Sequence, residues 1–304
     1  MSSCHACESE HFQLVLSDPE RQLVLNRCTS CGFVYLASWR DSLARSEELY
    51  DYYCHIEEDD LTRRHTAENR ARHLQLFSEL GAYTDGRRLL DVGCGDGQLL
   101  RSASEAGWQA LGIDLSGAAV GLCRKQGLDA AEIDFHSERL DTRRFDVIVM
   151  SELIEHVPSP AKFLARAAAL LDSQGVLYLT TPNFGSLARR ALRESWSVIH
   201  PEHIGYFERS TLRQMACDGA GLRELRIDAN NISPSTIVAW LKPGKRRTKI
   251  SVAEQHRNMR QGLDQRLRRS IHARPGLQKL KVAVNRIVSP LGLGDTLVAW
   301  FQKP

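Results

Sequence analysis

Residues 89–100 read Leu-Leu-Asp-Val-Gly-Cys-Gly-Asp-Gly-Gln-Leu-Leu. The apolar residues at the start of this stretch predict a buried strand, and helical spacing of apolar residues resumes after Gln98. Glycines at 93, 95 and 97 permit positive φ and let a ligand approach the backbone beside the unpaired N–H groups of a helix start. The stretch predicts a strand, a tight loop and a helix, and the loop either cradles a nucleotide or merely closes a turn.

The next predicted strand, 110–114, ends in an acid. A carboxylate at Asp114 is placed to accept hydrogen bonds from both hydroxyls of a ribose. The glycines alternate, and Asp91 precedes them, which differs from the dinucleotide-binding fingerprint. These features favour a nucleotide-like ligand of another kind.

Further strands and helices alternate along the chain. Apolar runs at 145–150 and 175–181 predict strands, and a helix is expected at 160–172, with Ser159 as its N-cap and Pro160 at its first position. This alternation predicts an α/β, doubly wound, Rossmann-like fold with ligand-binding residues at the carboxyl ends of the strands.

The order of these motifs closely resembles class I S-adenosylmethionine-dependent methyltransferases, over roughly residues 64–232 and 294–304. The matching motifs include Ile133-Asp134-Phe135, Ser151-Glu152-Leu153-Ile154-Glu155-His156-Val157 and Gly175–Asn183. The resemblance implies a seven-stranded, mostly parallel sheet with an antiparallel last strand. It also implies S-adenosylmethionine as cofactor and S-adenosylhomocysteine as product.

The resemblance assigns roles to individual residues. Asp114 is expected to hold the ribose, Leu115 to pack on adenine, and Asp134 with Phe135 to read the adenine amino edge. Arg72 either clamps the methionine carboxylate or is an ordinary solvated arginine. The cofactor-binding set is Asp91, Gly93, Cys94, Gly95, Gly97, Gln98, Asp114, Leu115, Asp134, Phe135, Ser151, Glu152 and Arg72.

Four cysteines near the start have the spacing C-x2-C-x20-C-x2-C: Cys4, Cys7, Cys28 and Cys31. Two such knuckles supply four thiolates to one tetrahedral Zn²⁺, and a closed site of this kind is structural. Disulfide pairing is the alternative. Strands on either side of Asp18-Pro19 make the segment a zinc ribbon, and its few basic residues favour docking or shaping of the substrate over binding of nucleic acid.

Candidate catalytic residues lie in two further motifs. Glu152, Glu155 and His156 share one face if their segment is helical, and His203 follows in a His-Pro-Glu-His sequence. This combination resembles ubiquinone-pathway O-methyltransferases and small-RNA 2′-O-methyltransferases. In one interpretation all four residues bind a divalent ion such as Mg²⁺. In another, His203 or His156 is a general base near Glu155. In the third, Glu155 caps a helix and His156 is buried.

The acceptor is constrained by a missing motif. Ser151-Glu152-Leu153-Ile154 stands where methyltransferases acting on planar exocyclic amines carry Asn/Asp-Pro-Pro-aromatic. We therefore expect O-methylation of a small-molecule or carrier-linked biosynthetic acceptor. The alternatives are metal-assisted 2′-O-methylation of RNA, C-methylation of a sugar or secondary metabolite, and an inactive cofactor-binding scaffold.

The charge of the chain is concentrated in one segment. Residues 242–286 carry fourteen Lys and Arg against two acids, whereas the whole chain has a net charge of +3. Two amphipathic helices with basic faces are expected there. They would form a lid, a dimer arm, or a dock for an anionic acceptor, RNA or a membrane surface, or else a merely solvated face.

The chain of 304 residues is predicted to have four parts. These are the zinc ribbon (1–36), a helical extension or cofactor lid (37–82), the methyltransferase domain (83–240 and 293–304) and the basic helical insertion (241–292). The chain has no apolar run long enough to span a bilayer and starts without a signal-peptide pattern, so a cytoplasmic location is expected.

Overall fold

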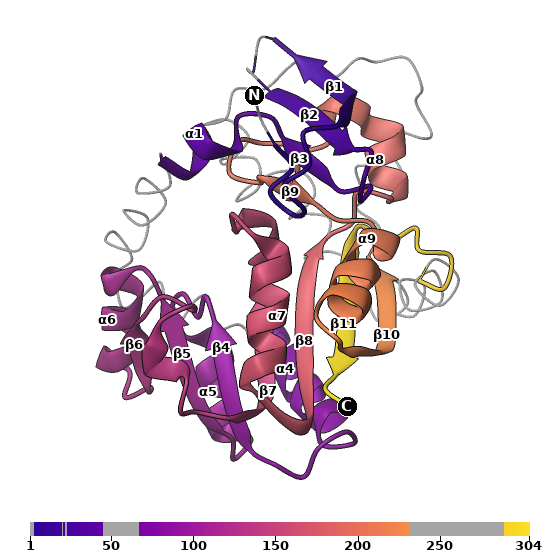
Figure 1. Ribbon diagram of the computed structural model, residues 1–304. Helices are drawn as coiled ribbons and strands as arrows, with labels where there is room; N and C mark the ends of the chain where they lie inside the picture. Colours follow the sequence, from indigo (N-terminus) through magenta and orange to yellow (C-terminus); the bar gives the residue numbers. More distant parts are fainter. Residues whose placement is uncertain (1–2, 20, 22, 45–66, 232–288) are drawn as a thin grey trace. The chain divides into compact units, whose positions relative to one another are not determined.

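The computed structural model describes residues 3–19, 21, 23–44, 67–231 and 289–304 (Figure 1). The expected basic helices of residues 242–286 and the part of the extension at 45–66 lie outside this range. The chain forms two compact units. One lies within Arg40–Thr180, Arg213–Arg226 and Ala299–Pro304, and the other within Met1–Trp39, Thr181–Leu212 and Ile227–Val298.

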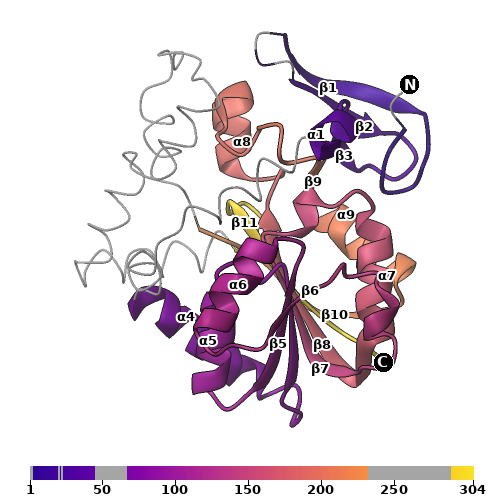
Figure 2. The same ribbon diagram turned by 90° about the vertical axis from the view of Figure 1, so that its left-hand side faces the viewer.

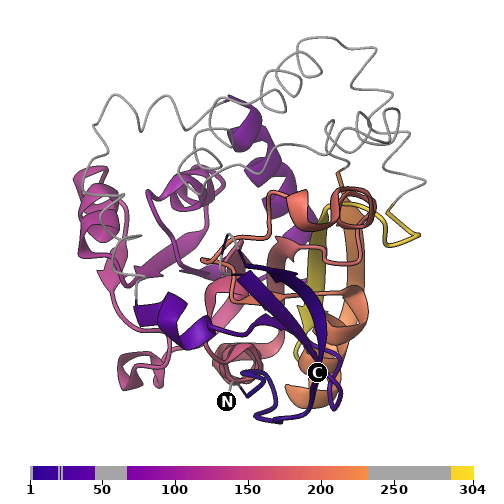
Figure 3. The ribbon, with the colours of Figure 1, turned by 90° about the horizontal axis from the view of Figure 1, so that it is seen from above.

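A seven-stranded sheet has the strand order β10-β11-β8-β7-β4-β5-β6, and most of its residues belong to the first of these units. The pairs β4–β5, β4–β7, β5–β6 and β7–β8 are parallel. Figure 3 shows β10, in orange, beside the yellow β11. The strands are β4 (Arg88–Val92), β5 (Gln109–Asp114), β6 (Ala130–Glu132), β7 (Phe145–Ser151), β8 (Leu171–Pro182), β10 (Arg223–Asn230) and β11 (Thr296–Gln302).

The last strand, β11, is antiparallel to its neighbour β8. Lys303 donates its backbone N–H to the carbonyl of Gly175 and accepts from the N–H of Gln174, an exchange typical of an antiparallel ladder. The predicted doubly wound sheet with an antiparallel last strand is confirmed.

Helices cover both faces of this sheet (Figure 2). On one face lie α4 (Ala67–Leu80), α5 (Gln98–Glu105) and α6 (Gly117–Lys125), and on the other lie α7 (Pro160–Leu170) and the short η4 (Gln214–Gly219). Leu89, Leu90 and Val147 are fully buried between these layers, because central parallel strands are covered on both faces.

One helix boundary differs from the sequence-based expectation. α7 begins at Pro160 as expected, but the Ser159 side chain makes no cap hydrogen bond. The helix ends at Leu170, two residues before the predicted end, and β8 follows directly at Leu171. Gly175, at the start of the predicted strand, lies inside β8.

The other unit contains a four-stranded sheet in the order β1-β2-β3-β9. Its antiparallel strands are β1 (Phe12–Asp18), β2 (Leu23–Cys28), β3 (Val34–Leu36) and β9 (Gly205–Tyr206). α8 (Leu187–Leu192) belongs to the same unit. Phe33, Tyr35 and Phe207 are fully buried in it. Its core therefore includes residues from the ribbon and from the segment after β8.

Two short helices stand near the unit boundaries along the chain, α1 (Trp39–Ala44) and α9 (Arg209–Arg213). Among the described residues, no helix is long and apolar enough to cross a membrane.

Candidate functional site

The glycine loop joins β4 to α5. Gly93, Gly95 and Gly97 have φ of 74°, 52° and 79°, the left-handed region that glycine adopts without a steric cost. The N–H groups of Gly93 and Cys94 both donate to the carbonyl of Ile113, at 2.8 and 3.1 Å. These bonds fasten the loop to the end of the neighbouring strand β5.

Packing under the loop requires glycine at its last position. A Cβ on Gly97 would lie 2.7 Å from Leu128 Cδ1 and 2.9 Å from Cys123 Sγ. The Cys123 thiol donates to the carbonyl of Gly95 at 3.2 Å. Gly93, by contrast, is exposed to solvent. The loop thus rests on side chains below and presents bare backbone above.

Asp114 connects the loop to the end of β5. Its Oδ2 accepts from the N–H of Gly95 at 3.0 Å, and its Oδ1 accepts from the N–H of Ser116 at 2.9 Å. Each carboxylate oxygen has a second lone pair, which suits ribose hydroxyls. The next side chain, Leu115, is apolar yet 53% exposed. An acid beside an open apolar surface and a bare glycine backbone fits an adenosine-containing ligand.

Asp91 and Asp114 form an acidic pair at this edge of the sheet. Asp91 is only 4% exposed. Burial, followed by the charge of Asp114, raises the pKa of the Asp91 carboxyl to about 7. The pair concentrates negative potential beside the loop and favours a cationic ligand group over an anionic one.

The loop after β6 carries Asp134 and Phe135. Asp134 Oδ1 accepts from the N–H of His136 at 2.6 Å. Phe135 is buried and packs on Phe163 of α7, with ring centroids 5.3 Å apart. Asp134 is exposed, and the expected contacts of Asp134 and Phe135 with adenine stay a prediction.

Sequence analysis missed the residue that holds this loop. Arg166 of α7 donates to the carbonyls of Phe135 and Ser137, at 3.3 and 3.0 Å, and forms an ion pair with Asp141 at 2.6 Å. The available signal was an arginine in the apolar stretch Pro-Ala-Lys-Phe-Leu-Ala-Arg-Ala-Ala-Ala-Leu. A charged side chain among such neighbours needs partners, and the loop supplies them.

The end of β7 carries Ser151 and Glu152, both exposed. Glu152 has a φ of 50°, and its N–H donates to the carbonyl of Thr180 at 3.0 Å. The surrounding protein removes part of the water around the Glu152 carboxyl and raises its pKa, while the Thr180 hydroxyl and the charge of Arg72 oppose this shift in part. Arg72 is an exposed residue of α4 whose charge thus reaches Glu152. Its predicted contact with the methionine carboxylate stays a prediction.

The condition under which Glu152, Glu155 and His156 would share a helical face is not met. Only Ile154–His156 is helical, as a single 3₁₀ turn, and Glu152 precedes it in a left-handed conformation. Glu155 is 1% exposed and His156 is half-buried. The i, i+3, i+4 spacing does not apply, because no α-helix covers these residues.

His203 belongs to the unit that contains the four-stranded sheet. Its Nδ1 lies 2.9 Å from the carbonyl oxygen of Val198. Since a carbonyl only accepts, Nδ1 must carry the hydrogen, so Nε2 of the neutral ring bears the lone pair. The ring packs on His200, with centroids 3.9 Å apart. This tautomer is the one that a base acting through Nε2 needs.

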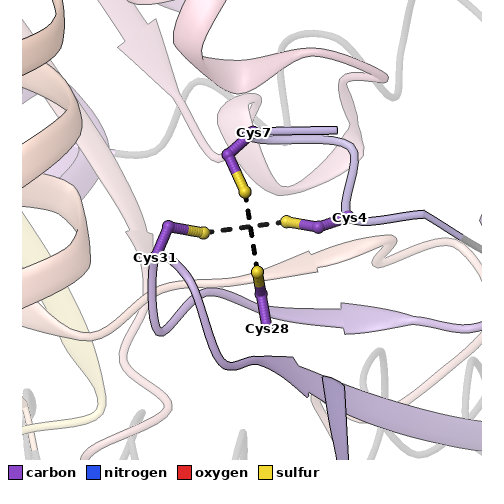
Figure 4. A group of neighbouring side chains, drawn as sticks. All are labelled: Cys4, Cys7, Cys28 and Cys31. Atoms are coloured by element: carbon purple, nitrogen blue, oxygen red, sulfur yellow. Dashed lines mark hydrogen bonds between the residues drawn. The ribbon is translucent and has the colours of Figure 1, made fainter. Parts of the chain in front are cut away.

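The four predicted zinc ligands converge on one point (Figure 4). Their sulfurs all lie within 4.8 Å of one another. The Cys4–Cys31 and Cys7–Cys28 sulfurs are 3.7 and 3.5 Å apart, close to the edge of about 3.8 Å that zinc–sulfur bonds of about 2.3 Å give a tetrahedron. All four are free thiols, so the alternative of disulfide pairing is not realised.

The two knuckles have the same backbone turn. The N–H of Glu8 donates to the carbonyl of Cys4 at 2.7 Å, and the N–H of Gly32 donates to the carbonyl of Cys28 at 2.9 Å. Glu8 and Gly32 have left-handed φ of 64° and 74°. Gly32 adopts this conformation without a steric cost, whereas Glu8 adopts it without that advantage.

The doubly wound sheet, the bare glycine loop and the acid at the next strand end define the domain of a class I S-adenosylmethionine-dependent methyltransferase. Residues 55–226 match the family described as "Methyltransferase domain". Because this match covers more than half of the chain, the chain belongs to that family.

Two relatives match part of the chain. The ubiquinone biosynthesis O-methyltransferase of Methylococcus capsulatus (strain Bath) is 40% identical over 105 residues, which are 32% of this chain and 44% of that protein. The protein of the same name from Bordetella bronchiseptica is 37% identical over 114 residues, covering 35% of this chain and 47% of that protein. The chain thus spans about half the length of these relatives.

Solved structures share the fold at low sequence identity. A SAM-dependent methyltransferase from Archaeoglobus fulgidus has a TM-score of 0.50 and 19% identity, covering 77% of this chain and 94% of that one. The plantazolicin methyltransferase BpumL, solved with a monoazolic desmethylPZN analog and SAH, has a TM-score of 0.51 and 15% identity, covering 88% and 97%. These likenesses bear on the fold alone.

Proposed function

We propose that this chain transfers the methyl group of S-adenosylmethionine to an oxygen atom of a small-molecule or carrier-linked acceptor. The observation that carries the cofactor assignment is the hydrogen bond from Gly95 to Asp114, which joins the bare loop to a carboxylate with unused lone pairs. Oxygen as the accepting atom is supported by the relatives named O-methyltransferases. The missing planar-amine motif after β7 supports it as well.

In this proposal the cofactor supplies a methyl group on a positively charged sulfur, and the chain holds the reacting groups in position. Asp114 holds the ribose, Leu115 packs on the adenine, and Asp134 with Phe135 reads the amino edge of the adenine. Holding the acceptor oxygen about 3 Å from the methyl carbon and in line with the breaking bond can contribute roughly 7–11 kcal/mol. S-adenosylhomocysteine is the product.

A base must remove the hydroxyl proton of the acceptor. We assign this role first to His203, whose Nδ1–H bond to Val198 leaves the lone pair on Nε2. His156 is the second candidate, with Glu155 as its acidic neighbour in the sequence. Both assignments rest on the motif and on the local geometry of each residue.

The test uses S-adenosylmethionine with a ¹³C-labelled methyl group. Catechols, vicinal diols, carrier-linked hydroxy acids and short RNAs are offered as acceptors, and NMR distinguishes methoxy from C-methyl carbon in the product. A methoxy product whose formation falls at least 100-fold in His203→Gln supports the proposal. His11→Gln, at an exposed residue, is the matched control. A C-methyl product, or full activity in both His203→Gln and His156→Gln, would overturn it.

A divalent ion is the alternative for the same reaction. Glu152, Glu155, His156 and His203 offer the oxygen and imidazole ligands that Mg²⁺ or a similar ion accepts. Activity that is abolished by EDTA and restored by Mg²⁺ would favour this alternative, with vicinal hydroxyls or an RNA end as the acceptor. RNA methylation with a steep salt dependence would move the substrate class to nucleic acid.

We also propose that Cys4, Cys7, Cys28 and Cys31 hold one structural Zn²⁺. The sulfur distances carry this assignment, because they match the edges of a zinc–thiolate tetrahedron. Elemental analysis should give one zinc per chain in the wild type and in Cys217→Ser, and well under one in Cys31→Ser. Equal zinc content in the two variants would contradict the assignment.

A further inference from the structure

The segment 199–208, which contains His203, is attached to both cysteine knuckles through its residues 204–208. β9 (Gly205–Tyr206) pairs with β3, with Val34 opposite Tyr206 and Tyr35 opposite Gly205. The fourth strand of the ribbon sheet is therefore the segment that follows directly after His203.

The first knuckle contacts this segment through His5, the residue between Cys4 and Cys7. The His5 ring is 4% exposed, and its Nε2 donates to the carbonyl of Ile204 at 3.1 Å. The N–H of Leu36 donates to the same carbonyl at 2.9 Å. Ile204 is the residue next to His203, so two ribbon groups hold the peptide group that directly follows the residue after the candidate base.

The His5 ring has little freedom to move. It packs edge-on against Phe33 and Tyr35, with ring centroids 5.2 and 6.0 Å away, and at a tilt against Trp39, 5.2 Å away. A buried ring with three aromatic neighbours and one hydrogen bond can transmit the geometry of the knuckle to the Ile204 carbonyl.

The second knuckle holds the other end of the segment. Arg27, which precedes Cys28, donates to both carboxylate oxygens of Glu208, at 2.7 and 3.4 Å, and to the carbonyl of Gly32 at 3.0 Å. Phe33 packs on Phe207, with ring centroids 5.0 Å apart. A paired guanidinium of this kind fixes both distance and orientation.

We infer that the cysteine knuckles position His203 and that His5 is the positioning residue through which the first knuckle acts. This inference rests on the proposed function in one respect only, namely that His203 acts as the base. Closing the knuckles around the metal would order 204–208 and keep the Val198–His203 bond in place. The ribbon would then be a part of the acceptor-side machinery rather than a separate attachment.

The test compares three full-length variants loaded with zinc. His5→Leu removes the donor to Ile204, His5→Gln retains an N–H donor at similar length, and His11→Leu is the control at an exposed site of the same ribbon. Hydrogen exchange of peptides covering 199–208 should speed up about tenfold in His5→Leu, as loss of a buried hydrogen bond implies. It should stay near the wild-type rate in His5→Gln and His11→Leu.

A spectroscopic readout separates positioning from general loosening. In protein labelled with ¹⁵N-histidine, the wild type and His5→Gln should show His203 with hydrogen on Nδ1, and His5→Leu should show a mixture of tautomers. Unchanged exchange and tautomer in His5→Leu would overturn the inference. If His5→Leu fails to retain zinc, the same two measurements are made on Arg27→Met, because this substitution releases the segment at Glu208. Faster exchange and a mixture of tautomers in Arg27→Met would support the inference, and wild-type behaviour would overturn it.

These readouts do not depend on methyl transfer. If His203→Gln keeps full activity in the labelled-methyl assay, His203 is not the base, and the coupling between knuckle and segment is unaffected. If His203→Gln loses activity while His5→Leu changes neither exchange nor tautomer, the base is supported and the coupling is overturned.

Discussion

The Oδ2 atom of Asp114 accepts a hydrogen bond of 3.0 Å from the backbone N–H of Gly95, so the end of β5 holds the loop that follows β4. The other oxygen of the same carboxylate accepts from Ser116, the N-cap of α6. One side chain thus orients the loop, the start of a helix and the expected ribose contact.

Replacing Asp114 by Asn should weaken cofactor binding. The amide presents an NH₂ group to one of two N–H donors, so either the loop or the start of α6 loses its acceptor. We expect S-adenosylhomocysteine to bind roughly 10- to 100-fold more weakly, as the loss of charged hydrogen bonds implies. Calorimetric titration measures this. Asp129→Asn, at an exposed acid before β6, should bind normally, and equal affinity in the two variants would remove Asp114 from the site.

The two glycines Gly97 and Gly107 provide a matched pair for the packing under the loop. Both have left-handed φ, of 79° and 77°, but a Cβ on Gly107 meets nothing within 4 Å. Alanine at Gly107 should cost about 1 kcal/mol of unfolding free energy from backbone conformation alone. Alanine at Gly97 should cost about 1–3 kcal/mol more, because it also collides with Leu128 and Cys123. Equal costs in urea unfolding would show that the loop relaxes freely.

The sequence predicted the parts of the fold that depend on local pattern. The structure has a strand that ends at Val92, as the apolar run predicts, and a turn of left-handed glycines after it. Asp114 ends the next strand, as its position after an apolar run predicts. The cysteine spacing likewise predicted a cluster, because metal ligation leaves a pattern that short-range sequence can carry.

Long-range pairing left no such pattern. Two residues, Gly205 and Tyr206, complete the ribbon sheet from a distant part of the chain, and neither alternation nor length marks them as a strand. The role of His5 depends on that pairing, so it could not be seen either. The spacing of Glu152 would have placed it on a shared face only in a helix, and its left-handed backbone follows from the strand β7 ending beside Thr180.

The acidic pair makes stability depend on pH in a direction opposite to that of an ordinary surface acid. The pKa of Asp91 is about 7 in the folded protein against 3.8 for the free side chain. Since the folded state binds the proton more tightly, the unfolding free energy falls as pH rises from about 4 to 7 and is level above that. From pH 5 to pH 8 this amounts to a loss of about 3 kcal/mol.

Asp91→Asn should remove this loss. The unfolding free energy of the variant minus that of the wild type should be larger at pH 8 than at pH 5. Urea unfolding at the two pH values, without S-adenosylmethionine, measures this difference. Asp129→Asn serves again as the control and should show no such difference. No difference between the two pH values would mean that the Asp91 carboxyl is already ionised in the folded protein at pH 5.

Arg166 should affect cofactor affinity without touching the cofactor. Its guanidinium holds the carbonyls of Phe135 and Ser137 and the carboxylate of Asp141, and so fixes the loop that carries Asp134. Arg166→Met keeps the side chain's length but removes all three contacts, and the loop would then be ordered only on binding. We expect affinity for S-adenosylhomocysteine to fall about 5- to 20-fold, within the cost of ordering a few residues.

Lys162→Met, at an exposed position of the same helix, should bind as wild type does. Adenine and adenosine should lose affinity by the same factor in Arg166→Met if the loop reads the base, whereas an effect confined to the full cofactor would place the contact elsewhere.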